Sequence, residues 1–165
     1  MLRFCTLVFG LTTITSICFA ECNFKTGQFI DELKDPSQIE LLKIEIPKSA
    51  KYAKNFLETV ISKTHTIPKK LKKRFNASIS VQYKFGECKY SGMIRQSGDF
   101  KDHIDYSQAT RPIRSLNVQL TSGNILSSTN FKLLLPHTRN GAHEILASLI
   151  LKKLGFISPE TFEIE

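Results

Sequence analysis

Two neighbouring segments with a two-residue hydrophobic alternation constrain the fold of this chain more than any other feature. Over residues 76–85 the odd-numbered positions are apolar and the even-numbered ones polar, and a second strand is expected over residues 88–96. A period of two places one face of a strand in a core and the other in solvent. Gly86-Glu87 between the two segments is typical of a turn. The sequence therefore predicts an antiparallel hairpin with one buried face.

Further elements around this hairpin set the fold class. Tyr52, Phe56 and Val60 recur at helical spacing, and Gly155 stands where a left-handed helix cap is expected. Strands are predicted over residues 39–46, 115–120 and 129–135, and helices over 48–62 and 140–154. This mixture predicts an α+β fold, an antiparallel sheet with two main helices packed on it. Residues 160–165 begin another alternating pattern that stops without a turn, so we expect the N-terminal piece of a longer protein.

The first twenty residues are interpreted as a signal peptide and not as part of the fold. Arg3 precedes an apolar run that ends in small residues before Ala20, which is the three-part pattern of a cleaved secretory signal. The alternative is a retained anchor, for which the run is short. Residues 21–165 are then one exported domain, secreted or periplasmic. The composition of the full 165-residue chain, 41% hydrophobic and 23% charged, excludes a disordered chain.

Export changes the interpretation of the cysteines. Cys22 and Cys88 remain after removal of the signal peptide. In an oxidising compartment a lone pair most simply forms a disulfide, although two free thiols are the alternative. A zinc site is disfavoured because the pair lacks the close spacing of zinc ligands.

The net charge of +8 favours an anionic partner. The densest group of cations lies in one short run and comprises Lys69, Lys70, Lys72, Lys73 and Arg74. One interpretation is contact with an anionic glycan or an envelope surface, and the other is a solvated basic turn. Arg139 and His137, just before the second helix, are a second candidate anion site, and the alternative is that they are surface or capping residues. Nucleic acid is disfavoured, because the chain is exported and lacks a basic strand interleaved with aromatic residues.

Residues 99–105 carry an acidic group around one imidazole, formed by Asp99, Asp102, His103 and Asp105. Their spacing matches no calcium loop, so a solvated loop is favoured over a cation site. The sequence contains no hydrolase elbow, zinc-protease motif or phosphate-binding Walker loop.

Residues 92–98 read Gly-Met-Ile-Arg-Gln-Ser-Gly. They look like the glycine-and-serine loop following an arginine in the spore-coat protein H (CotH) kinase-like family, and the resemblance extends from Gly92 to Glu165. The strand at residues 131–135, the Arg139-Asn140 pair and the helix ending at Leu154-Gly155 look like that family's middle stretch. The chain is also similar to uncharacterised secreted bacterial proteins.

The resemblance implies the ATP-covering small lobe of an atypical protein kinase, which uses ATP with a divalent metal. It implies phosphate contacts from Arg95, Ser97 and Gly98, with Lys132 as a phosphate-pairing lysine and Glu144 as its partner. The family's own lysine position corresponds to Asn117 here. The resemblance also implies that the acidic residues that hold metal would follow Glu165. The fragment is therefore expected to be catalytically incomplete alone. The alternative is a secreted binding module for anionic polysaccharide or an envelope surface, and a third is a structural envelope domain without a ligand.

Overall fold

The computed structural model describes residues 21–24, 30–106, 112–136 and 140–164. The expected signal peptide lies outside these residues. The strands are β1 (Glu21–Phe24), β2 (Ile39–Glu45), β3 (Phe75–Tyr83), β4 (Gly86–Gln96), β5 (Ile104–Asp105), β6 (Ile113–Arg114), β7 (Leu116–Leu120) and β8 (Asn130–Leu133). The α-helices are α1 (Ser49–Ile61) and α2 (His143–Lys153), and short 3-10 helices are η1 (Ile30–Lys34), η2 (Pro36–Gln38), η3 (Lys69–Leu71) and η4 (Lys101–His103).

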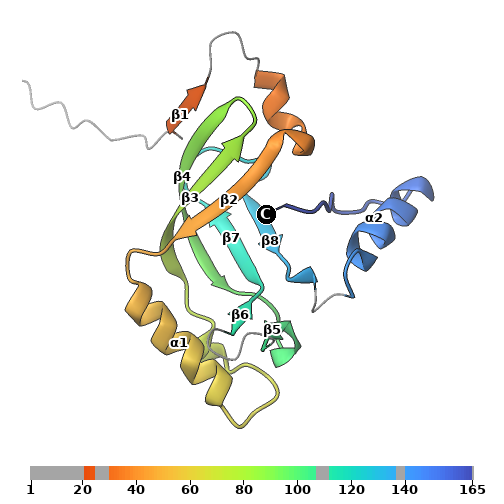
Figure 1. Ribbon diagram of the computed structural model, residues 1–165. Coiled ribbons are helices and arrows are strands. Elements are labelled where there is room, and N and C mark those ends of the chain that lie inside the picture. The colour runs from red at the N-terminus through yellow and green to blue at the C-terminus, as the bar shows by residue number, and fades with distance from the viewer. Residues whose placement is uncertain (1–20, 25–29, 107–111, 137–139, 165) are drawn as a thin grey trace, which may run out of the picture.

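A curled antiparallel sheet with strand order β2-β3-β4-β7-β8 forms the body of the molecule (Figure 1). The long strand β4 has two partners on one edge, because its first half pairs with β1 and its second half with β7. β5 and β6 form a small separate sheet that the sequence did not predict. The predicted α+β class is confirmed.

The alternation that defined the hairpin sorts its side chains to two faces. On β3 the inward side chains of Ile79, Val81 and Tyr83 are buried, while the side chains between them face outward. The core also takes residues from β2, β4, β7 and β8. We call the opposite, solvent-facing side the outer face; most of its central side chains are hydroxyl, amide and cationic groups, and Met93 lies among them.

The hairpin turn lies two residues earlier than predicted. Tyr83 pairs directly with Gly86, so Lys84 and Phe85 form a two-residue turn and Gly86-Glu87 belongs to β4. The ring of Phe85 is buried and stacks on Tyr83 at 5.4 Å, which holds the turn there. Gly86 serves a different purpose: a Cβ at this position would lie 2.2 Å from the carbonyl oxygen of Asn23. Glycine is therefore required by the close approach of β1 and not by the turn.

The two helices differ in how they meet the sheet. α1 lies across its lower end (Figure 1), and the residues it buries most deeply are Asn55 and Thr59. Tyr52, Phe56 and Val60, predicted as the apolar face, are half-buried beside them. Phe75 receives Tyr52 edge-to-face at 5.4 Å.

α2 stands off to the side of β8 (Figure 1). It ends as predicted at Gly155, whose φ is +80°. The amides of Gly155 and Phe156 donate to the carbonyls of Lys152 and Leu151, which is a Schellman cap. Residues 160–164, predicted to begin a strand, have no regular secondary structure. They return along α2, where the hydroxyl groups of Ser148 and Thr161 lie 2.9 Å apart.

Candidate functional site

Two cations predicted as ligand-binding residues share one row of the outer face. Arg95 on β4 lies directly opposite Asn117 on β7, and Asn117 lies directly opposite Lys132 on β8. Directly opposed residues point to the same side of a sheet. With strands about 4.8 Å apart, the Cα atoms of Arg95 and Lys132 are about 10 Å apart. Asn117 therefore lies between the two cations.

Arg95 is only partly satisfied where it lies. Its Nε atom is buried and has no hydrogen-bond partner in the described part of the chain. The same holds for the Oε1 atom of Gln119, two residues beyond Asn117 along β7. An unpaired buried polar group costs about 1–3 kcal/mol. A ligand that drew the guanidinium outward would recover part of that cost.

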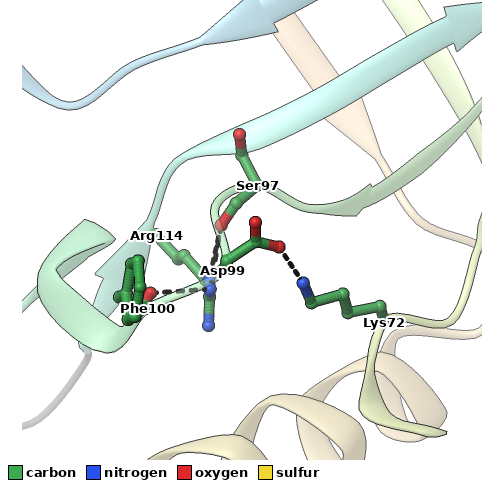
Figure 2. Close-up of polar contacts among 5 residues, drawn as sticks. All are labelled: Lys72, Ser97, Asp99, Phe100 and Arg114. Atoms are coloured by element: carbon green, nitrogen blue, oxygen red, sulfur yellow. Dashed lines mark hydrogen bonds and ion pairs between the residues drawn. The ribbon is translucent and has the colours of Figure 1, made fainter. Parts of the chain in front are cut away.

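Figure 2 shows that the loop after β4 is held by a buried arginine. The Nε and Nη2 atoms of Arg114 both donate to the carbonyl oxygen of Ser97, at 3.2 and 2.8 Å. The Ser97 amide donates to the carbonyl of Ser115 at 2.9 Å. Ser97 is buried, with 6% of its surface exposed, and Gly98 takes a φ of +82° at the turn that follows. The amide and the carbonyl group of Ser97 are thus both hydrogen-bonded within the protein. The loop is held in place by these bonds and positions the residues that follow it.

The arginine begins a chain of buried side chains that reaches α1. Arg114 Nη1 donates to Gln96 Oε1 at 2.8 Å, and Gln96 Nε2 donates to Asn55 Oδ1 at 2.9 Å. Because arginine can only donate hydrogen bonds, the side-chain amides of Gln96 and Asn55 each turn their oxygen toward Arg114 and their nitrogen away from it. Its end, Asn55 Nδ2, is a buried donor without a partner among the described residues. We call these three residues the arginine relay.

None of the three residues of the arginine relay is among the predicted site residues, although the sequence carries a signal for them. Arg114 is in phase with the inward residues of β7, and Gln96 continues the inward positions of β4. Asn55 lies between Tyr52 and Thr59 on the buried side of α1. A long polar side chain in phase with a core face must find hydrogen bonds there or be left unpaired.

The electrostatics of the relay follow from burial. Loss of water lowers the pKa of Arg114 below its ordinary value, although Tyr52, Tyr106 and Asp102 oppose that effect. Burial likewise raises the pKa of Tyr52, and the nearby charge of Arg114 offsets part of the rise. Each of the four hydrogen bonds of the guanidinium goes to a carbonyl or amide oxygen and none to a carboxylate. Arg114 is therefore a structural cation that is stabilised by carbonyl and amide dipoles.

The basic run is divided by the fold. Lys72 is largely covered and forms an ion pair with Asp99 (Figure 2), so it fastens the run to the loop after β4. Leu71 is buried, and the amide of Ile67 donates to the Asp99 carbonyl at 2.8 Å. The four other cations remain exposed on this anchored segment: Lys69, Lys70, Lys73 and Arg74.

The acidic loop does not assemble into a metal site in the part of the chain that the structure describes. Asp99 is engaged by Lys72. Lys101, within the same loop, donates to the carbonyls of Val60 at 3.1 Å and of Ser62, at the end of α1. Across residues 21–24, 30–106, 112–136 and 140–164 no three His, Cys, Asp or Glu side chains come together in a way that suits a metal ion.

The remaining predicted residues are distributed as follows. Glu144 lies in the first turn of α2. The helix α2 lies on the β8 side of the molecule (Figure 1). Arg139 and His137 lie outside the described residues. Cys22 and Cys88 face each other across β1 and β4 and form the predicted disulfide, which is confirmed. None of the described helices has the length and apolar character that a bilayer crossing requires.

Comparisons with known proteins add no relative. No protein-family model, curated protein or solved structure matches the chain.

Proposed function

We propose that this chain is the nucleotide-covering lobe of an exported, CotH-like atypical kinase-related protein, catalytically incomplete by itself. The observation that carries the proposal is the row formed by Arg95, Asn117 and Lys132 on the outer face. Two cations about 10 Å apart on one rigid surface suit the phosphates of a nucleotide. The buried, unpartnered Nε of Arg95 leaves one donor unused within the described residues.

The order of elements is consistent with the same proposal. Kinases pair a strand lysine with a helix glutamate, and the lysine contacts the phosphates. Lys132 lies on β8, and Glu144 opens α2, the next helix along the chain. The position of the family's lysine is occupied here by the neutral Asn117. Arg95 and Lys132, on either side of it, supply the positive charge instead. The described residues bring no metal-ligand group together, so we derive no phosphoryl-transfer step.

A thermal-shift titration tests this function. Magnesium or manganese ATP at millimolar concentration should raise the melting temperature of the wild-type protein. The double variant Arg95→Ala/Lys132→Ala should abolish the shift. Lys89→Ala is the matched control, because Lys89 is an exposed cation on the first half of β4. An absent shift in the wild type, or an equal shift in the double variant, would contradict the proposal.

A second candidate function rests on a different observation, the anchored basic segment. Lys69, Lys70, Lys73 and Arg74 stay exposed, while Leu71 and Lys72 fix the backbone beneath them. A pre-ordered group of cations binds a polyanion without the cost of ordering a flexible loop. The partner of this surface would be an anionic glycan or an envelope surface bearing phosphate or carboxylate groups.

Retention on heparin and on lipopolysaccharide tests the second candidate. Replacing the four exposed cations of the segment by glutamine should collapse retention. The matched control removes four exposed lysines elsewhere, namely Lys48, Lys51, Lys54 and Lys63. Equal losses in the two variants would show that net charge alone governs retention, and the segment would then have no specific role.

We also propose export to an oxidising compartment. The Cys22–Cys88 disulfide supports this proposal, since such bonds persist mainly outside the cytosol. The signal-peptide interpretation of residues 1–20 agrees with it. Mass spectrometry of the exported protein should find Glu21 as the first residue, and an N-terminus at Met1 would contradict cleavage.

A further inference from the structure

The outer face holds a hollow that neither proposed function uses. It lies over the beginning of β3 and the second half of β4, has a volume of about 450 Å³ and falls within the usual size range of small-molecule sites. Its lining comprises Pro47, Asn76, Ala77, Ser78, Ser91, Gly92, Met93 and Thr121. The row of Arg95 adjoins it, because Arg95 is the next outward residue of β4 after Met93, but no residue of that row lines the hollow.

Register shows which atoms line this hollow. Asn76 lies opposite Met93 and Ser78 opposite Ser91, and all four alternate with buried positions, so their side chains point outward. Ala77 and Gly92 lie at the buried positions between them and therefore offer backbone to the floor. At one end the amide of Thr121 donates to the Ser91 carbonyl at 2.8 Å, which fixes that side.

The lining is chemically unusual for this protein. The whole chain carries a net charge of +8, yet none of the eight lining residues is charged. The side chains of Asn76, Ser78 and Thr121 form no hydrogen bond within the described part of the chain. The next residue across the sheet from Met93 is Gln119, whose Oε1 atom is also unpartnered there. Hydroxyl and amide groups thus surround the apolar side chains of Met93 and Pro47.

This mixture of polar and apolar groups suits one ligand class. An anion would find no cation in the lining, and an apolar ligand would leave the hydroxyl and amide groups unpaired. A polyhydroxylated ring offers hydroxyls that both donate and accept, together with C–H groups that can rest on Met93 and Pro47. We infer that the hollow binds a neutral carbohydrate, one sugar unit of an oligosaccharide, through the side chains of Asn76, Ser78 and Thr121. This inference does not depend on nucleotide binding.

NMR titration of the intact protein with neutral hexasaccharides tests the inference. The probes are cellohexaose, maltohexaose, xylohexaose and chitohexaose, each at roughly 10 mM, which reveals a Kd of about 1 mM or tighter. At least one probe should shift the Met93 methyl signal and the amide signals of Ser78 and Thr121. Ser78→Gln, which fills the hollow, should weaken binding about tenfold. Ser80→Gln is the matched control, because Ser80 is the next outward residue of β3 and lies outside the lining.

Three outcomes of this titration would contradict carbohydrate binding. Silence with all four probes, equal affinity of the two glutamine variants, or shifts confined to the basic segment would overturn the inference. If Ser78→Gln fails to fold, the wild-type Met93 methyl signal still gives the answer. Magnesium ATP provides a separate arm: ATP-induced shifts at Met93 with no sugar response would refute carbohydrate binding while supporting the nucleotide proposal. Sugar binding without any ATP response would support carbohydrate binding and contradict the nucleotide proposal.

Discussion

Replacing Arg114 by methionine should weaken the protein substantially, because the guanidinium satisfies buried oxygens that have no substitute donor. Arg114→Met keeps a long side chain of similar reach but removes every donor. It leaves Gln96 Oε1 and the Ser97 carbonyl unpaired, on residues that are 2% and 6% exposed. Each orphaned acceptor costs about 1–3 kcal/mol, so the gross loss is about 2–6 kcal/mol.

One effect opposes this loss. Arg114 as a whole is 6% exposed and none of its hydrogen bonds within the described residues goes to a carboxylate, so removing the guanidinium relieves a desolvated charge. We therefore expect a net loss in the lower half of the range, about 2–4 kcal/mol, which corresponds to a fall in Tm of about 4–16 °C for a domain of this size.

Arg114→Lys separates charge from geometry. A lysine keeps the charge but lacks the planar guanidinium. That group donates two hydrogen bonds to the Ser97 carbonyl oxygen and one to Gln96 Oε1. We expect this variant to lose at least as much stability as Arg114→Met. Arg74→Met is the control, since Arg74 is exposed and its replacement should stay within about 0.5 kcal/mol.

Urea denaturation followed by circular dichroism measures these differences, and hydrogen exchange at Ser97 to Phe100 locates them. Faster exchange should appear in that loop and in α1, which the relay joins to it through Asn55. A lysine variant as stable as the wild type would show that charge alone matters. A methionine variant whose free energy of unfolding lies within about 0.5 kcal/mol of the wild-type value would show that the relay makes no net contribution to stability.

Three further predictions concern the sheet. Reducing the Cys22–Cys88 disulfide, which closes a sequence separation of 66, should lower the free energy of unfolding by about 4 kcal/mol in urea melts. Gly86→Ala should cost about 1–3 kcal/mol and speed hydrogen exchange in β1, because the new Cβ would lie 2.2 Å from the Asn23 carbonyl oxygen. The pKa of Tyr83 is raised, chiefly by burial, so above about pH 10 the unfolded chain loses a phenolic proton that the folded chain keeps. Stability should then fall as the pH rises further, and Tyr83→Phe should move the midpoint of alkaline unfolding, followed by circular dichroism, to higher pH.

These three predictions have distinct controls. Reduction should leave a Cys22→Ser/Cys88→Ser variant unchanged, and an equal effect on that variant would point to the reductant. Ser80→Ala on the outward side of β3 tests an alanine substitution on a strand that does not pair with β1. An unchanged alkaline midpoint in Tyr83→Phe would mean that the buried phenol does not govern unfolding at high pH.

The sequence determined the parts of this fold that depend on near neighbours. Alternation placed Ile79, Val81 and Tyr83 on one buried face. The helix end at Gly155 and the pairing of Cys22 with Cys88 also followed from the residue types. Each of these features rests on a local period, on a backbone conformation that glycine adopts easily, or on the only partner left in the expected mature chain.

Tertiary structure alone decided which distant residues meet. Register brought Arg95 and Lys132 into one row, and ring packing moved the hairpin turn to Lys84-Phe85. Burial selected Arg114 as a structural cation with partners 17 and 18 residues away. Strand register is a relation between segments, and a hydrogen-bond partner far along the chain leaves no mark on local periodicity. For that reason the faces of this sheet could be predicted from the sequence, whereas the groups gathered on them could not.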